Sequence, residues 1–143
     1  MTAETDTTEI RAVLDAVRKG HRDKDAAAIG AQYAEDAVIF DLSPPLAHTP
    51  DVSGIAAWLD TWEGPVDLQA NDLTVEISGD LAFCHGLSKT SATTKPDGQR
   101  AQWWQRLTVC LRRTDGGWKI VHEHTSVPFY MDGSYRAAVD LEP

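Results

Sequence analysis

Two strand-like runs flank a glycine turn in the stretch Arg100–Val127, RAQWWQRLTVCLRRTDGGWKIVHEHTSV. Both runs are rich in residues that favour β-strands, and Asp115-Gly116-Gly117 supplies the residues that a tight hairpin turn requires. The chain upstream repeats this pattern, with strands expected over 66–77 and 81–91 and turns at Gly79-Asp80 and Lys95-Pro96-Asp97-Gly98. The second half of the chain therefore predicts an antiparallel meander of four long strands.

Helix signals come before the meander. Asp6-Thr7-Thr8-Glu9 has the spacing of an N-cap with an acidic residue three positions later, and Gly20 is expected to end that helix. Asp25 caps a second, shorter helix over Ala26–Tyr33. A third helix, which Gly64-Pro65 ends, carries apolar residues at i, i+3, i+4 and i+7, namely Ile55, Trp58, Leu59 and Trp62.

A short strand lies between the second and third helices. In Ala37–Leu42 the side chains of Val38, Phe40 and Leu42 are expected on one face, and those of Ala37, Ile39 and Asp41 on the other. Ser43-Pro44-Pro45 ends this strand, because proline cannot donate to a ladder. Helices first and long strands last predict one α+β domain over residues 1–143, with about three N-terminal helices covering the concave face of a curved antiparallel sheet.

Composition limits the partners that the chain can have. It has 143 residues, with 13 Lys and Arg against 22 Asp and Glu, and a net charge of −9. This charge repels phosphate backbones and anionic lipid surfaces, so neither nucleic acid nor a membrane is an expected partner. The acidic start at Met1–Asp6 lacks the pattern of a signal peptide, and we expect a cytoplasmic protein. Cys84 and Cys110 are expected to be reduced core thiols.

The paired histidines of His122-Glu123-His124 are the sharpest local feature. On a strand, the two imidazoles project from one face and Glu123 from the other. They are interpreted as an acid/base or substrate-binding pair, as metal ligands with His85 and Asp41, or as hydrogen-bonded structural residues. A metal is the less favoured of these, and neither a metal nor a cofactor is expected.

Asp41 and Arg106 are the other charged candidates. A carboxylate among the apolar neighbours of Asp41 would be desolvated, which favours a base, although a strand-end aspartate can also cap a turn. Arg106 shares a face with Trp104 and Thr108, and needs a carboxylate or substrate oxygen if it points inward; the alternative is a surface or dimer-interface arginine. A two-residue turn at 115–116 would put His122 on the face of Val109, and one more residue would put it on that of Arg106.

Segments along nearly the whole chain carry a family resemblance. They are Asp41–Leu46, Trp62–Pro65, Ala82–Gly86, Trp104–Thr108 and, most specifically, Trp118–Phe129. Together they resemble the SnoaL-like branch of the NTF2-like superfamily, relatives of polyketide cyclases and ketosteroid isomerase. The resemblance implies a cone with a curved sheet, three covering helices, a deep pocket and a homodimer formed through the sheet. It implies the fold better than the reaction.

These observations predict a cofactor-independent enzyme that abstracts a proton next to a carbonyl of a small, largely apolar substrate. Asp41 would be the base, His122 and His124 would bind or relay, and Arg106 would stabilise negative charge. The pocket would be lined by Trp62, Trp104, His85, Trp58, Phe40 and Met131. The alternatives are a non-catalytic small-ligand-binding module and an oligomerisation domain with a vestigial pocket.

Overall fold

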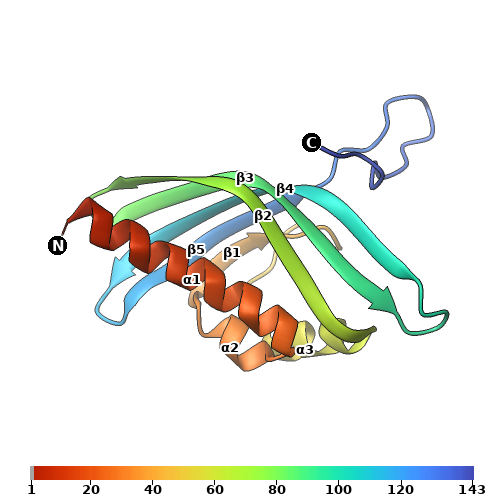
Figure 1. Ribbon diagram of the computed structural model, residues 1–143. Helices are drawn as coiled ribbons and strands as arrows, with labels where there is room; N and C mark the ends of the chain where they lie inside the picture. Colours follow the sequence, from red (N-terminus) through yellow and green to blue (C-terminus); the bar gives the residue numbers. More distant parts are fainter. Residues whose placement is uncertain (1) are drawn as a thin grey trace.

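The structure is a computed structural model that describes residues 2–143 (Figure 1). Three helices and five strands follow one another along the chain. Their bounds are α1 (Ala3–Asp23), α2 (Ala26–Gly30), β1 (Tyr33–Phe40), α3 (Val52–Asp60), β2 (Trp62–Ser78), β3 (Leu81–Thr94), β4 (Arg100–Thr114) and β5 (Gly117–Ser126). The predicted α+β class is confirmed. No helix among residues 2–143 is long and apolar enough to span a membrane.

The five strands form one curved sheet in the order β1-β5-β4-β3-β2. The meander from β2 to β5 is antiparallel as expected, but β1 pairs parallel with β5, so the sheet is mixed. Alternation of side chains predicts that a segment is a strand but does not predict its neighbour in the sheet. The parallel pairing of β1 therefore could not be predicted from the sequence pattern. In Figure 1 α1 runs across the concave side of the sheet, and α2 and α3 lie near the C-terminal end of α1.

The core lies between α1 and part of the concave face of the sheet. It contains Ile10, Val13 and Val17 of α1, Ile29 of α2, Leu59 of α3, and the sheet residues Val66, Cys84, Val109, Leu111, Trp118 and Ile120. Cys84 is buried and Cys110 is half-buried, and both are free thiols. The burial of these apolar side chains is the main contribution that holds the helices on the sheet.

The ends of α1 differ from the prediction. Thr2, not Asp6, is the N-cap, and its side chain accepts a hydrogen bond from the Thr5 amide at 3.1 Å. Gly20 does not end the helix, which continues to Asp23. A Cβ on Gly20 would lie 2.5 Å from Cγ1 of Ile29, so glycine is needed for the close approach of α2.

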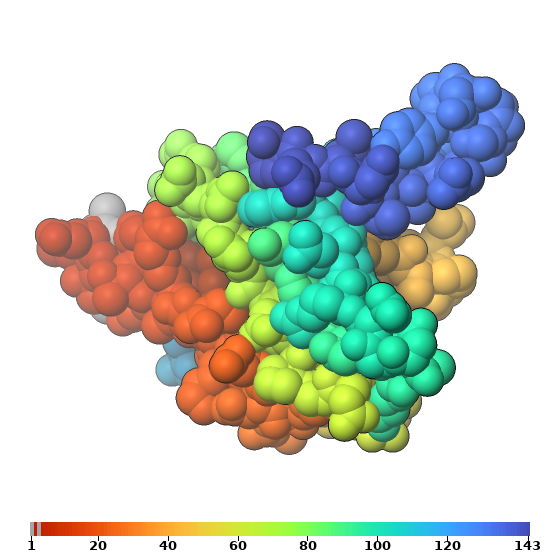
Figure 2. Space-filling view, turned by 45° about the vertical axis from the view of Figure 1, so that its right-hand side comes forward, coloured from red at the N-terminus to blue at the C-terminus, as the bar shows by residue number. Residues whose placement is uncertain are grey.

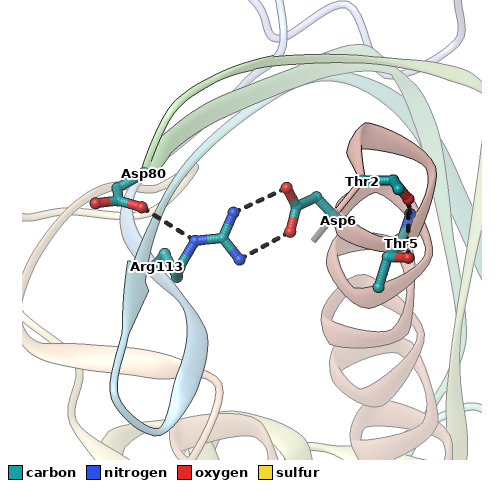
Figure 3. Close-up of polar contacts among 5 residues, drawn as sticks. All are labelled: Thr2, Thr5, Asp6, Asp80 and Arg113. Carbon is teal, nitrogen blue, oxygen red and sulfur yellow. Dashed lines mark hydrogen bonds and ion pairs between the residues drawn. The ribbon is translucent and has the colours of Figure 1, made fainter.

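Because Asp6 is not the N-cap, its carboxylate is available for a contact outside the helix. Its carboxylate forms a two-pronged ion pair with Arg113 of β4, with both N···O distances at 2.8 Å (Figure 3). Nε of Arg113 donates to Asp80 in the β2–β3 turn at 3.0 Å, and its guanidinium lies 4.6 Å from the centre of the Trp118 ring. This network holds the first turn of α1 against the end of β4 and the β2–β3 turn.

A β-bulge in β5 decides which side chains face inward. Leu111 pairs with Ile120, and Cys110 pairs with His122, so Val121 is an extra residue without a partner on β4. The turn has two residues, since Thr114 pairs with Gly117. The bulge nevertheless shifts the register by one residue, as a longer turn would have done. As a result, His122 shares the outer face with Cys110 and Arg106, and Glu123 faces inward beside Val109.

The chain after β5 lies away from the helices. In Figure 1 it is on the opposite side of the sheet from α1, and Figure 2 shows it projecting from the body. An isolated bridge between Phe129 and Ala137 shapes this segment, and Met131 is 81% exposed.

Candidate active site

A cavity of about 1010 Å³ opens between the concave face of the sheet, α1, α3 and the loop from Asp41 to Asp51. Most of its wall is apolar, with Leu14, Ile39, Ile55, Trp58, Leu107 and Val109 among the lining residues. This size and character suit a small organic ligand, for which a few polar groups set the orientation. The polar groups that line the cavity are therefore the candidates for chemistry.

Glu123 and Tyr33 form the first polar group. The Tyr33 hydroxyl donates to Oε2 of Glu123 at 2.9 Å, and both side chains line the cavity. Burial raises the pKa of Glu123 to about 7, although the Tyr33 hydrogen bond lowers it and the nearby Asp41 raises it. Burial and the Glu123 charge hold the pKa of Tyr33 well above its usual value. Glu123 therefore changes protonation near neutral pH, and Tyr33 stays a donor.

Asp41 and His48 form the second polar group. A bridge between Ile39 and His48 folds the loop back onto β1 and brings Nε2 of His48 to 3.4 Å from Oδ2 of Asp41. The other oxygen of Asp41 accepts from the Leu42 amide at 3.1 Å, so the carboxylate also caps its own turn. Nδ1 of His48 donates to the Thr49 carbonyl at 2.9 Å, because a carbonyl can only accept. The predicted shared face of Ala37 and Ile39 is confirmed, since both are buried. Asp41 comes just after the last residue of β1 and lines the cavity, but its side chain is 47% exposed, so the predicted desolvation of this carboxylate is wrong.

His21 of α1 is a third group in the cavity wall. Its Nδ1 donates to the Val17 carbonyl at 2.8 Å, and its ring packs edge-on against Trp58 with centroids 6.2 Å apart. Burial lowers the pKa of this imidazole. The neutral ring then presents an unprotonated Nε2, which is a hydrogen-bond acceptor.

Six of the predicted site residues lie on the outer face of the sheet, away from the cavity. They are His122, His124, Arg106, Trp104, His85 and Phe40. The Phe40 ring packs edge-on against His122 and His124, with centroids 4.8 and 5.4 Å apart, and Nδ1 of His122 contacts the Val38 carbonyl at 2.7 Å. The bulge at Val121 explains the placement of His122 and His124. The predicted convergence of His122, His124 and Arg106 with Asp41 is therefore wrong, and their catalytic roles stay untested predictions.

The remaining predicted wall residues divide between the two sides. Trp58 lines the cavity, whereas Met131 lies in the segment after β5 and does not. Trp62 belongs to β2 and not to α3, because the helix ends at Asp60. Its ring lies behind the wall, 6.0 Å from that of Trp58 and 6.2 Å from that of Trp103.

Six residues that line the cavity are not among the site residues predicted from the sequence: Tyr33, His21, His48, Ser88, Gln105 and Glu123. The alternation Trp103, Gln105, Leu107, Val109 along β4 could have identified Gln105 as inward, since Val109 is apolar and central. Within residues 2–143 no group of three or more His, Cys, Asp or Glu is arranged to hold a metal ion.

Comparison with known proteins agrees with this architecture. The family model described as a SnoaL-like domain matches residues 10–130. The chain belongs to the SnoaL-like family. A solved NTF2-like protein of unknown function from Pseudomonas putida KT2440 is 31% identical, with a TM-score of 0.85 over 100% of this chain and 99% of that one. No curated protein matches this SnoaL-like chain.

More distant solved structures share the fold of this SnoaL-like protein. A candidate dehydratase of the NTF2-like family from Streptomyces avermitilis is 17% identical, with a TM-score of 0.76 over 87% of this chain and 97% of that one. A candidate aromatic ring hydroxylase from Novosphingobium aromaticivorans is 21% identical, with a TM-score of 0.74 over 88% and 91%. The activities in these descriptions differ, so function must be argued from the site.

Proposed function

We propose that this protein is a cofactor-independent enzyme that moves protons at a carbon next to a carbonyl group, in a small and largely apolar substrate. Isomerisation, cyclisation and dehydration all begin with this step. The observation that carries the proposal is Glu123, a carboxyl group whose pKa burial raises to about 7, facing a mostly apolar cavity that Asp41 also lines. Two carboxyl groups in different surroundings are the usual basis for dividing acid and base roles.

Asp41 is the base in this proposal. Ile39 pairs with Glu123, and Asp41 follows two residues later, just past the end of β1 and in the cavity wall, about 7 Å further along the chain. Its Oδ2 removes the proton from carbon, and His48, which in its protonated form donates from Nε2 as well as Nδ1, holds the carboxylate in place at 3.4 Å. The electron pair of the broken C–H bond moves into the new C=C bond, and negative charge develops on the carbonyl oxygen.

Glu123 is the acid in this proposal. Tyr33 occupies Oε2, so Oε1 is the oxygen that can donate to the substrate when Glu123 is protonated. A donor in an apolar cavity stabilises the developing charge on the substrate oxygen more than water would. Transfer of the Glu123 proton to that oxygen gives the enol. When the enol is later protonated at a different carbon atom, the proton on its oxygen returns to Glu123.

Exchange of carbon-bound hydrogen for deuterium tests the proposal directly. The protein is incubated in deuterium oxide with cyclic ketones that bind it, 2-tetralone among them, and loss of the signal of hydrogens next to the carbonyl is followed by proton NMR. We expect exchange in the wild type and its loss in Asp41→Asn and Glu123→Gln. Absence of exchange for bound ketones contradicts the proposal. Loss in Asp41→Asn and His122→Ala with full activity in Glu123→Gln would favour the roles predicted from sequence.

We also propose a homodimer formed through the outer face of the sheet. Large apolar side chains are exposed on this face at positions that alternate along β1 and β3, namely Val38, Phe40, Leu81, Phe83 and Leu87. An exposed apolar surface of this kind is characteristic of an interaction site.

A further inference from the structure

A chain of hydrogen bonds with a fixed direction runs along the inner face of the sheet. Nε1 of Trp103 donates to Oε1 of Gln105 at 2.8 Å, and Nε2 of Gln105 donates to Oγ of Ser88 at 3.1 Å. An indole N–H can only donate, so it holds the amide oxygen of Gln105 toward Trp103 and the amide nitrogen toward Ser88. All three residues line the cavity.

This direction leaves hydrogen-bond donors for a ligand. Oγ of Ser88 accepts from Gln105, so the hydroxyl hydrogen of Ser88 must point elsewhere, and no acceptor for it is found among residues 2–143. The Gln105 amide has a second hydrogen that is likewise uncommitted. Ser88 is only 5% exposed, and an unmet donor at this depth costs free energy unless a water or a ligand accepts from it.

These donors lie apart from the carboxyl groups. Ser88 pairs with Gln105, whereas Glu123 pairs with Val109, four residues further along β4. Four residues of a strand span about 13 Å. A ligand that contacts both groups must therefore be elongated, with two rings or an equivalent length.

The chemistry of the wall selects a neutral oxygen. The donors of Gln105 and Ser88 are uncharged, and the same cavity contains the carboxyl groups of Asp41 and Glu123, which disfavour an anionic ligand. Ketone, ether and ester oxygens are neutral acceptors that match such donors.

We propose that Gln105 and Ser88 form a specificity subsite that binds a neutral hydrogen-bond-accepting oxygen of the substrate, remote from its reacting carbonyl. Trp103 is the positioning residue, since it fixes the Gln105 amide. The subsite rests on the proposed function, because it assumes that the reacting carbonyl binds at Glu123. The substrate class is then an elongated, largely apolar ketone with a second oxygen function near its far end.

Two ketones of matched shape test the subsite. The probes are 6-methoxy-2-tetralone and 6-ethyl-2-tetralone, which differ by an ether oxygen in place of a methylene, and the Kd of each is measured by isothermal titration calorimetry. We expect Ser88→Ala to lower the preference for the methoxy compound about tenfold relative to the wild type, the factor expected for loss of one good hydrogen bond. Gln105→Glu should have the same effect, because a carboxylate cannot donate and captures the Ser88 hydroxyl.

Ser91→Ala is the matched control. Ser91 is a buried serine of the same strand that does not line the cavity, so its loss should leave the preference unchanged. Thermal denaturation checks that each variant is folded, and if Ser88→Ala is not, Gln105→Glu decides.

The outcomes separate the subsite from the proposed function. An unchanged preference in folded Ser88→Ala or Gln105→Glu overturns the subsite, whether or not deuterium exchange occurs. A preference that falls in these variants, with no exchange of either bound ketone, supports the subsite and contradicts the acid/base activity. If neither ketone binds the wild type, both the subsite and the proposed function are wrong.

Discussion

The phenol of Tyr33 donates a hydrogen bond to Glu123 at 2.9 Å, across 90 residues of sequence. The contact depends on the parallel pairing of β1 with β5, in which Tyr33 pairs with Ile120 and Ile39 with Glu123. It joins the first strand of the chain to the last inside the cavity. The protonation of Glu123 is thus coupled to the stability of the fold.

Stability should fall as the pH rises through neutrality. Burial raises the pKa of Glu123 from 4.5 in the unfolded chain to about 7, so the folded chain binds more protons between these values. The contribution of Glu123 is present below about pH 4.5 and is lost as the pH rises through 7, by about 3 kcal/mol in the free energy of unfolding. Urea denaturation of the wild type and of Glu123→Gln across this range measures it. The exposed Glu76→Gln is the control, and an equal pH dependence in Glu123→Gln and the wild type would contradict the prediction.

Removing the Tyr33 hydroxyl should move the titration of Glu123 upward. The hydrogen bond from Tyr33 lowers the pKa of Glu123, so Tyr33→Phe leaves burial and Asp41 to raise it further. The pH midpoint of deuterium exchange, or of the infrared carboxyl band of Glu123, should shift to higher pH. A downward shift would show that Tyr33 does not stabilise the ionised form.

The Asp6–Arg113 pair should contribute to stability at neutral pH and not in acid. Arg113 lowers the pKa of Asp6, so the contribution is present above the unfolded value of 3.8 and is lost as the pH falls through the lower folded value. Asp6→Asn should lower the melting temperature by several degrees at pH 7 and have little effect near pH 2. Asp80→Asn is the control with a smaller effect, because the Asp80 side chain is 77% exposed. Equal effects of the two variants at pH 7 would contradict this assignment.

The outer face of the sheet should hold two copies together. Sedimentation equilibrium of the wild type is expected to give twice the chain mass of 15.7 kDa. Phe83→Asp places a charge among the exposed apolar side chains of this face and should give monomers, whereas Leu46→Asp, in the exposed loop after β1, should not. A monomeric wild type at micromolar concentration would rule out this dimer.

Much of the fold follows from the sequence. The turns at Gly79-Asp80, Lys95–Gly98 and Asp115–Gly117 lie where the strands end, and the alternation of Ala37 and Ile39 gives the inward face of β1. These features are local, because turn residues and period-two patterns act over a few positions.

The features that could not be predicted from the sequence depend on contacts between distant segments. Asp6 has the local pattern of an N-cap, but Arg113 takes its carboxylate, and Gly20 has the pattern of a helix end, but Ile29 needs its space. His48 reaches Asp41 only because its loop folds back onto β1. The inward direction of Glu123 depends on the bulge, which no turn residue marks in the sequence.

Val121 also affects how this protein must be compared with its relatives. A relative whose last strand lacks the extra residue keeps the same inward positions, since deleting Val121 leaves Ile120 and Glu123 on one face. If the two sequences are aligned from Ile120 without a gap, however, the inward carboxyl of that relative falls on His122. Functional residues will then be transferred to the wrong side of the sheet. A one-residue gap at 121 is therefore needed before conservation at this strand can be interpreted.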